Sequence, residues 1–178
     1  MRSIDKWFVV AAFAVAILGA VPVAAHAQLG VHAVAGVWGF SGDDLDDLDA
    51  GFGVDGGISV RPSDQFSIGG GFHWSSHGVA ESTDDVTMIQ VVATPVIHLG
   101  APGETDVFFG ARGGWARLSD NDEDLTGVVV GPLAGVGFPL GGRVSAGVGG
   151  TFSLLSLTDD VSGSSWGVGA FIGIGLGG

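Results

Sequence analysis

A two-residue alternation between large apolar side chains and small polar ones runs through most of this chain. Phe66, Ile68, Phe72 and Trp74 share one face of an extended strand, whose other face carries glycine, serine and histidine. A strand at the surface of a soluble β-sandwich would expose a charged and well hydrated face, and this one has almost no charge. Large residues facing lipid and small residues lining a narrow lumen would satisfy the pattern, so it predicts a transmembrane β-barrel.

The alternation recurs at nearly even spacing, with turn residues between the segments. We therefore expect an all-β fold: an eight-stranded antiparallel up-and-down barrel, because closure leaves no unpaired strand edge in lipid. The pairs and runs of valine at 91–92 and 128–130 break the alternation, and Pro95 and Pro132 each remove a ladder donor, which predicts bulges or local distortion there. The expected strands are 29–40, 51–61, 65–75, 86–98, 106–117, 126–138, 143–155 and 165–176.

The first 27 residues have the pattern of a cleaved signal peptide. A short start with Arg2 and Lys6 precedes an apolar run over residues 7–25, and an Ala-His-Ala cleavage site ends at Ala27. We expect export to the bacterial outer membrane and a mature barrel domain of residues 28–178. The chain has no cysteine, so the hydrogen bonds of a closed ladder, and not disulfides, must hold this domain together.

The connections between the expected strands alternate between long and short, as in bacterial outer-membrane barrels with periplasmic turns and longer outer loops. Most of the 19 acidic residues fall in the long connections, and the formal net charge of the chain is -13. This acidity argues against a nucleic-acid partner. The short turns are 61–65, 100–105 and 139–142, and the long acidic stretches are 41–50, 76–85, 119–124 and 156–164.

Aromatic residues gather near the ends of the expected strands, as in the two girdles of a barrel in a bilayer. The rhythm of segments such as 94–99 followed by 107–114 resembles that of the small outer-membrane barrels of the OmpA and OmpX kind. The resemblance implies contact with outer-membrane lipid and insertion by the barrel assembly machinery. That family usually ends in an aromatic residue, whereas this chain ends in Gly178. The residues expected at the lipid interface are Trp38, Phe52, Phe66, Trp74, Phe109, Trp115, Phe138, Phe152 and Trp166.

A few charged residues fall on the inward face among glycines. Asp55 and Arg112 lie at similar heights in mid-barrel, and we expect them to pair because an unpaired charge in an enclosed lumen is costly. Asp106, Arg61 and Arg143 gather near the mouth formed by the short turns. One interpretation is a set of internal ion pairs that replaces an apolar core, and the other is a selectivity element in a pore.

The acidic loops contain one candidate cation site. Asp120, Asp122 and Asp124 begin like a calcium loop, but Leu125 stands in place of the turn glycine and Gly131 in place of the closing glutamate. We therefore predict no specific metal site, and only diffuse association of divalent cations with the outer loops.

The segment with His73, Ser75 and His77, followed by Glu81, contains the residue types of an acyl-hydrolase triad. It faintly resembles the His-x-Ser element of outer-membrane lipid A deacylase barrels, although Ser76 stands where that family has Asn. The alternation turns His73 and Ser75 into the lumen, whereas attack on a membrane lipid needs them outside. A lipid-modifying hydrolase is thus a remote alternative, and the sequence predicts neither a catalytic residue nor a cofactor.

The sequence predicts a non-enzymatic outer-membrane barrel with a structural or surface-interaction role through its acidic outer loops. The alternative is a small passive porin-like channel. An eight-stranded lumen is about wide enough for side chains to fill, but here many inward positions are glycine, and Phe108 and Phe171 would fill part of the space. Conductance measurements on the refolded protein would separate the two alternatives.

Overall fold

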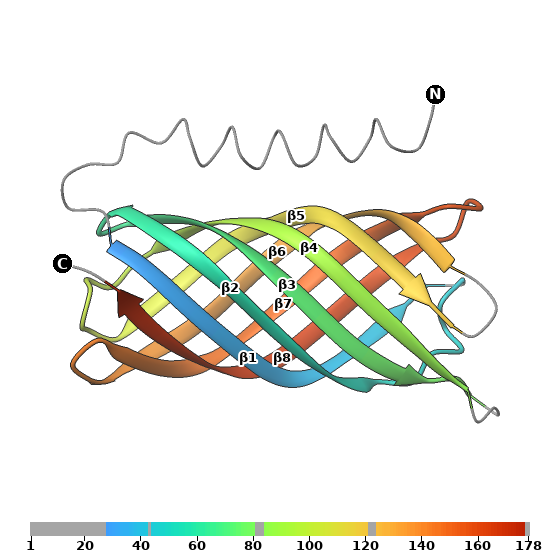
Figure 1. The fold of residues 1–178 in the computed structure, drawn as a ribbon, viewed down its shortest axis with the longest axis horizontal. Helices are drawn as coiled ribbons and strands as arrows, with labels where there is room; N and C mark the ends of the chain where they lie inside the picture. The colour runs from blue at the N-terminus through green and yellow to red at the C-terminus, as the bar shows by residue number, and fades with distance from the viewer. Residues whose placement is uncertain (1–27, 43, 81–83, 121–123, 177–178) are drawn as a thin grey trace.

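The computed structural model describes residues 28–42, 44–80, 84–120 and 124–176, and it shows a closed antiparallel β-barrel (Figure 1). Each strand pairs with the next one in sequence, and β1 pairs with β8 to close the sheet. The predicted fold class is therefore confirmed. The strands are β1 (Gln28–Ser41), β2 (Gly51–Ser63), β3 (Phe66–Gly78), β4 (Asp85–His98), β5 (Asp106–Ser119), β6 (Asp124–Gly141), β7 (Val144–Leu157) and β8 (Ser162–Leu176).

The strand pairing at the two prolines tests the predicted bulges or local distortion. The β4–β5 ladder is interrupted at Thr94 and Pro95, and the β6–β7 ladder at Gly131 and Pro132, but the register is the same on both sides of each gap. The prolines therefore distort the ladder locally, and neither produces a bulge. A proline lacks the N–H and removes one ladder bond, and here it does so without displacing the strand. The register shifts instead lie near the short turns, at the end of β2 and at the end of β6. Gly141 and Gly142 have positive φ angles of 117° and 58°, which only glycine adopts readily.

The outer surface of the barrel is an apolar belt. The side chains of Phe72, Val128, Val148 and Val168 are each about half exposed or more. Many other large apolar residues at outward-facing strand positions are exposed as well. Outward positions on β2, β5, β7 and β8 follow the predicted alternation. A continuous apolar surface of this extent needs a lipid cover. Among the described residues, no helix is long and apolar enough to cross a membrane.

The two ends of the barrel differ (Figure 1). Three short connections, at residues 64–65, 99–105 and 142–143, lie at one end together with the start of β1 and the end of β8; we call this the short-turn end. The opposite, long-loop end carries the acidic connections. Its first two loops are joined by an isolated antiparallel bridge between Leu48 and Val79.

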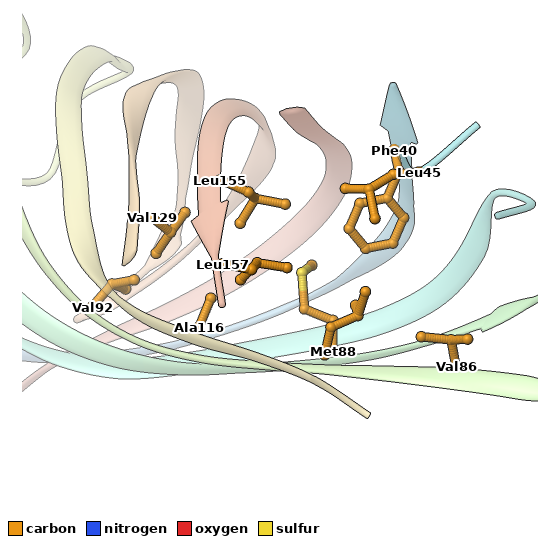
Figure 2. Close-up of a cluster of buried hydrophobic side chains, with 10 residues drawn as sticks. Phe40, Leu45, Val86, Met88, Val92, Ala116, Val129, Leu155 and Leu157 are labelled. Carbon is orange, nitrogen blue, oxygen red and sulfur yellow. The ribbon is translucent and has the colours of Figure 1, made fainter. Parts of the chain in front are cut away.

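The core of the molecule fills the half of the lumen near the long-loop end (Figure 2). We call this cluster of buried apolar side chains the outer plug. The sequence prediction of a lumen lined by glycine and serine is wrong for this half. Where two large apolar residues are adjacent, as in Leu154-Leu155, one side chain is exposed on the lipid face and the other is buried in the lumen. The outer plug consists of Phe40, Leu45, Val86, Met88, Val92, Ala116, Leu118, Val129, Leu155 and Leu157.

Candidate functional site in the barrel lumen

A layer of polar side chains crosses the lumen just below the outer plug. The guanidinium of Arg112 lies 3.6 Å from a carboxylate oxygen of Asp55, and its Nη2 donates a 2.8 Å hydrogen bond to Gln90 Oε1. The imidazole nitrogens of His32 and His73 lie 3.7 Å and 3.9 Å from the same carboxylate. Asp55 is therefore surrounded by one cation and two imidazoles, and a bare carboxylate in this lumen would be costly without them.

The structure thus brings Asp55 and Arg112 together and adds three partners that the sequence reasoning missed. Three inward-facing positions at nearly the same height of β1, β3 and β4 hold His32, His73 and Gln90. Their shared inward orientation is the sequence signal that could have predicted the contacts. The prediction compared charged residues only, so it did not include these three.

Trp38 corrects one of the interface predictions. Its side chain is only 4% exposed and points into the lumen, where its ring lies 4.8 Å from the ring of His73. A Cβ atom on Gly53 or Gly167 would collide with the indole, so glycines on the neighbouring strands provide its space. Large aromatic residues near strand ends usually face the bilayer interface, but here the parity of β1 and these two glycines turn the ring inward.

The other predicted interface aromatics lie on the outer face. Trp74 and Trp115 are partly buried there by their neighbours. The exposed ones are Phe52, Phe66, Phe109, Phe138, Phe152 and Trp166.

The His-Ser-His segment forms a buried chain of hydrogen bonds. Ser75 Oγ lies 3.1 Å from His73 Nε2 and 2.8 Å from His77 Nε2, and His77 Nδ1 lies 3.1 Å from the backbone oxygen of Asp49. All three side chains have no solvent exposure. Glu81 lies outside the described residues. A substrate has no access to Ser75, so this segment acts as part of the core.

Below the polar layer the lumen opens into a cavity of about 390 Å³, which we call the inner cavity. Its walls are mainly glycine backbone and apolar side chains, including Val34 and Val96. Phe108 and Phe171 meet edge to face in its wall with ring centroids 5.7 Å apart, so they narrow the lumen without closing it. Turn residues such as Pro102 line the mouth, which places the opening at the short-turn end.

Ser67, His98 and Asp106 form a hydrogen-bonded row at this mouth. Ser67 Oγ lies 2.8 Å from His98 Nε2, and His98 Nδ1 lies 2.5 Å from Asp106 Oδ2. The second carboxylate oxygen of Asp106 accepts a 3.0 Å hydrogen bond from the N–H of Gly100. The Nη2 of Arg61 donates to the carbonyl oxygen of Gly100 at 2.8 Å, so these side chains are fixed to the turn after β4.

The predicted group at the short-turn mouth is therefore only partly assembled. Arg61 and Asp106 both contact Gly100, and the side-chain partner of Asp106 is His98. Arg143 lies exposed on the turn between β6 and β7. Ser67 and His98 were missed because the prediction compared charged residues only. Their inward parity at the ends of neighbouring strands was the signal available.

The long-loop end carries exposed acidic side chains. Asp124 receives hydrogen bonds of 2.7 Å and 2.8 Å from Arg117 Nη2, and these bonds, with a further one from Ser119, lower the pKa of this carboxyl, which lies beyond the aromatic girdle. Asp120 is exposed, and Asp122 lies outside the described residues. Within the described part of the chain, no three His, Cys, Asp or Glu side chains are grouped as metal ligands.

The fold defined by these observations is that of the small eight-stranded outer-membrane barrels. The chain is similar to neisserial surface protein A, with 17% identity and a TM-score of 0.73 over 83% of this chain and 97% of that one. It also resembles the Yersinia pestis outer membrane protein Ail in a phospholipid nanodisc (17% identity, TM-score 0.50, 85% and 100% covered). The N-terminal barrel domain of Pseudomonas aeruginosa OprF gives 13% identity and a TM-score of 0.50, with 85% and 100% covered. No family model and no curated protein sequence matches the chain.

Proposed function

We propose that this protein is a closed, non-conducting barrel of the bacterial outer membrane with a structural and surface-interaction role. The observation that carries this proposal is the outer plug, because its ten buried apolar side chains, together with buried polar side chains such as His77 and Ser153, occupy the lumen near the long-loop end. A passive channel needs a continuous hydrated path, and an apolar constriction of this length opposes the passage of water and ions. The apolar belt and the likeness to solved outer-membrane barrels support the location.

The outer loops supply the interaction surface in this proposal. Leu45 is buried in the outer plug, and Leu48 packs against it, so the first loop is folded down onto the barrel. Asp44 accepts a 3.0 Å hydrogen bond from the N–H of Ser162, which ties this loop to the start of β8. The exposed carboxylates of Asp46 and its neighbours therefore stand on an anchored base, where diffuse divalent cations or a cationic partner would meet them.

Conductance in planar lipid bilayers tests the closed barrel directly. The refolded protein should give no discrete channels, because the outer plug blocks the lumen. A variant hollowed by Met88→Ala, Leu155→Ala and Leu157→Ala should conduct, since these side chains lie in the plug. Val148→Ala, on the lipid face, is the matched control and should stay silent. Regular channels from the unaltered protein would contradict the proposal and favour the passive pore.

A further inference from the structure

The row of Ser67, His98 and Asp106 has the connectivity of a hydrolase triad, with a hydroxyl on one imidazole nitrogen and a carboxylate on the other. We propose that these residues hydrolyse small acyl esters that enter the inner cavity from the short-turn end. Ser67 is the nucleophile, His98 the general base and Asp106 a positioning residue. This activity goes beyond the proposed role of the outer loops, and it departs from the sequence-based prediction of a non-enzymatic barrel.

The carboxylate of Asp106 fixes the tautomer of His98. An ionised carboxylate only accepts hydrogen bonds, so the 2.5 Å contact requires a proton on His98 Nδ1. In the neutral imidazole the opposite nitrogen, Nε2, is an acceptor, and the hydroxyl of Ser67 can donate to it at 2.8 Å. The proton of the hydroxyl therefore already points at the base that must take it, as nucleophilic catalysis by serine requires.

The carboxylate is itself held in place. The N–H of Gly100 donates to Asp106 Oδ1 at 3.0 Å, and Arg61 donates to the carbonyl oxygen of the same residue. His98 ends β4 and Asp106 begins β5, so the base and its orienting group flank the turn that contains Gly100. Pre-positioning of this kind is what separates a working acid-base pair from a chance contact.

The inner cavity gives this row a substrate space, which the buried His-Ser-His chain lacks. Ser67, His98 and Asp106 all line the cavity of about 390 Å³, within the range of pockets that hold small ligands. Its apolar walls suit an acyl chain, and Val96 and Phe108 flank the row. Ser75, by contrast, has two imidazole partners but no exposure. The two serines that contact histidines among the described lumen residues thus differ in access: Ser67 lines a cavity and Ser75 does not.

The reaction follows from this geometry in two steps. Ser67 Oγ bonds to the carbonyl carbon of the ester while its proton passes to His98 Nε2; the carbon–oxygen bond to the alcohol then breaks, and the alcohol leaves with that proton. Water next attacks the acyl-Ser67 carbon and gives a proton to His98, which returns it to Ser67 Oγ as the carboxylic acid departs. No oxidant, metal or cofactor is needed to balance either step.

Positive charge for the developing oxyanion is available from Arg61, which lines the same cavity. The N–H groups of the strands are engaged in the ladder, so this guanidinium takes the part that backbone donors play in dedicated hydrolases. We therefore expect slower turnover than in dedicated hydrolases. Covalent labelling of the serine is the more sensitive measurement, because the labelled product accumulates with time.

The test uses the refolded chain in detergent micelles with a fluorophosphonate probe and p-nitrophenyl butyrate. The probe should label Ser67, identified by peptide mass spectrometry, and the ester should release p-nitrophenolate. Ser67→Ala should abolish labelling and lower hydrolysis by about 10²–10⁴-fold, the range for loss of acid-base chemistry. Ser59→Ala, which removes another hydroxyl from the same cavity wall, is the matched control and should change neither.

Asp106→Asn tests the positioning role, because an amide can leave His98 in the wrong tautomer. It should lower kcat by about 10²-fold or more with little change in KM, and slow the labelling of Ser67 equally. Gel mobility before and after heating checks that each variant is folded. A folded wild type that is not labelled, or a Ser67→Ala variant that hydrolyses the ester at the wild-type rate, would overturn the proposal.

Discussion

At the scale of single residues, the contact between Asp55 and Arg112 shows how a narrow lumen treats charge. Arg112 is also bonded to Gln90, and Asp55 has two imidazoles within 4 Å, so neither charge depends on a single partner. The side chains are 13% and 7% exposed and both line the inner cavity. Water on the cavity side should reduce the free-energy cost of removing one of the two charges, because partial hydration stabilises the charge that remains.

A double-mutant cycle measures this coupling. Asp55→Ala and Arg112→Ala should each lower the free energy of unfolding by about 3 kcal/mol, near the lower limit for buried pairs, because each removes the opposite charge and leaves its partner with polar neighbours only. The double variant should recover part of that loss. Urea titration of the protein in lipid vesicles gives the three values. Simple additivity would show that the two charges do not interact, despite the 3.6 Å separation of their atoms.

The alternation of inward and outward positions along each strand explains which residue contacts the sequence could predict and which it could not. Asp55 and Arg112 were predictable because opposite charges at one height in a lumen must pair. The inward orientation of the Trp38 ring was not predictable, because it depends on the space left by two glycines, Gly53 and Gly167, on the two neighbouring strands. The partner of Asp106 was missed for another reason: the prediction compared Asp, Glu, Lys and Arg residues only, and the partner is His98.

At the scale of the strands, alternation locates the elements well because each side chain meets either lipid or lumen. Most of the observed strands extend the predicted ones by one to three residues toward the long-loop end; β3, for example, ends at Gly78 and β8 begins at Ser162. The ladder continues there past the apolar belt, where the alternation of apolar residues is lost but strand pairing is not. Hydrophobicity therefore marks the bilayer-facing part of a strand better than the end of its hydrogen bonding.

Arginine substitutions on the lipid face test the assignment of faces. Val148→Arg and Ile172→Arg each place a charge in the middle of the apolar belt and should lower the free energy of unfolding by about 2–4 kcal/mol. Leu176→Arg has the same parity at the end of β8 and should cost about 0–1 kcal/mol, as expected near an interface. The measurement is urea unfolding in vesicles. Equal costs at all three positions would mean that the belt is not centred in the bilayer.

At the scale of the whole molecule, the lumen is divided into two unlike halves. The outer plug fills one half with apolar side chains, the polar layer crosses the middle, and the inner cavity opens at the short-turn end. Sequence reasoning predicted the closed barrel but treated its lumen as uniform. The difference arises from where large residues fall on inward positions: near the long-loop end they are Leu, Val and Met, and toward the short-turn end glycines alternate with a few polar groups.

This division is testable because the chain has no cysteine, so a single introduced thiol reports on its own surroundings. Ser145→Cys places a thiol on the wall of the inner cavity and should react quickly with a charged methanethiosulfonate reagent in the folded protein. Ser153→Cys lies on the same strand with the same inward parity, but Ser153 is 1% exposed beside the outer plug, so its thiol should react only after unfolding. The ratio of the two labelling rates, followed by mass spectrometry, measures how completely the lumen is sealed. Equal rates would show a lumen hydrated from end to end, which would remove the physical basis of a closed barrel and favour the passive channel.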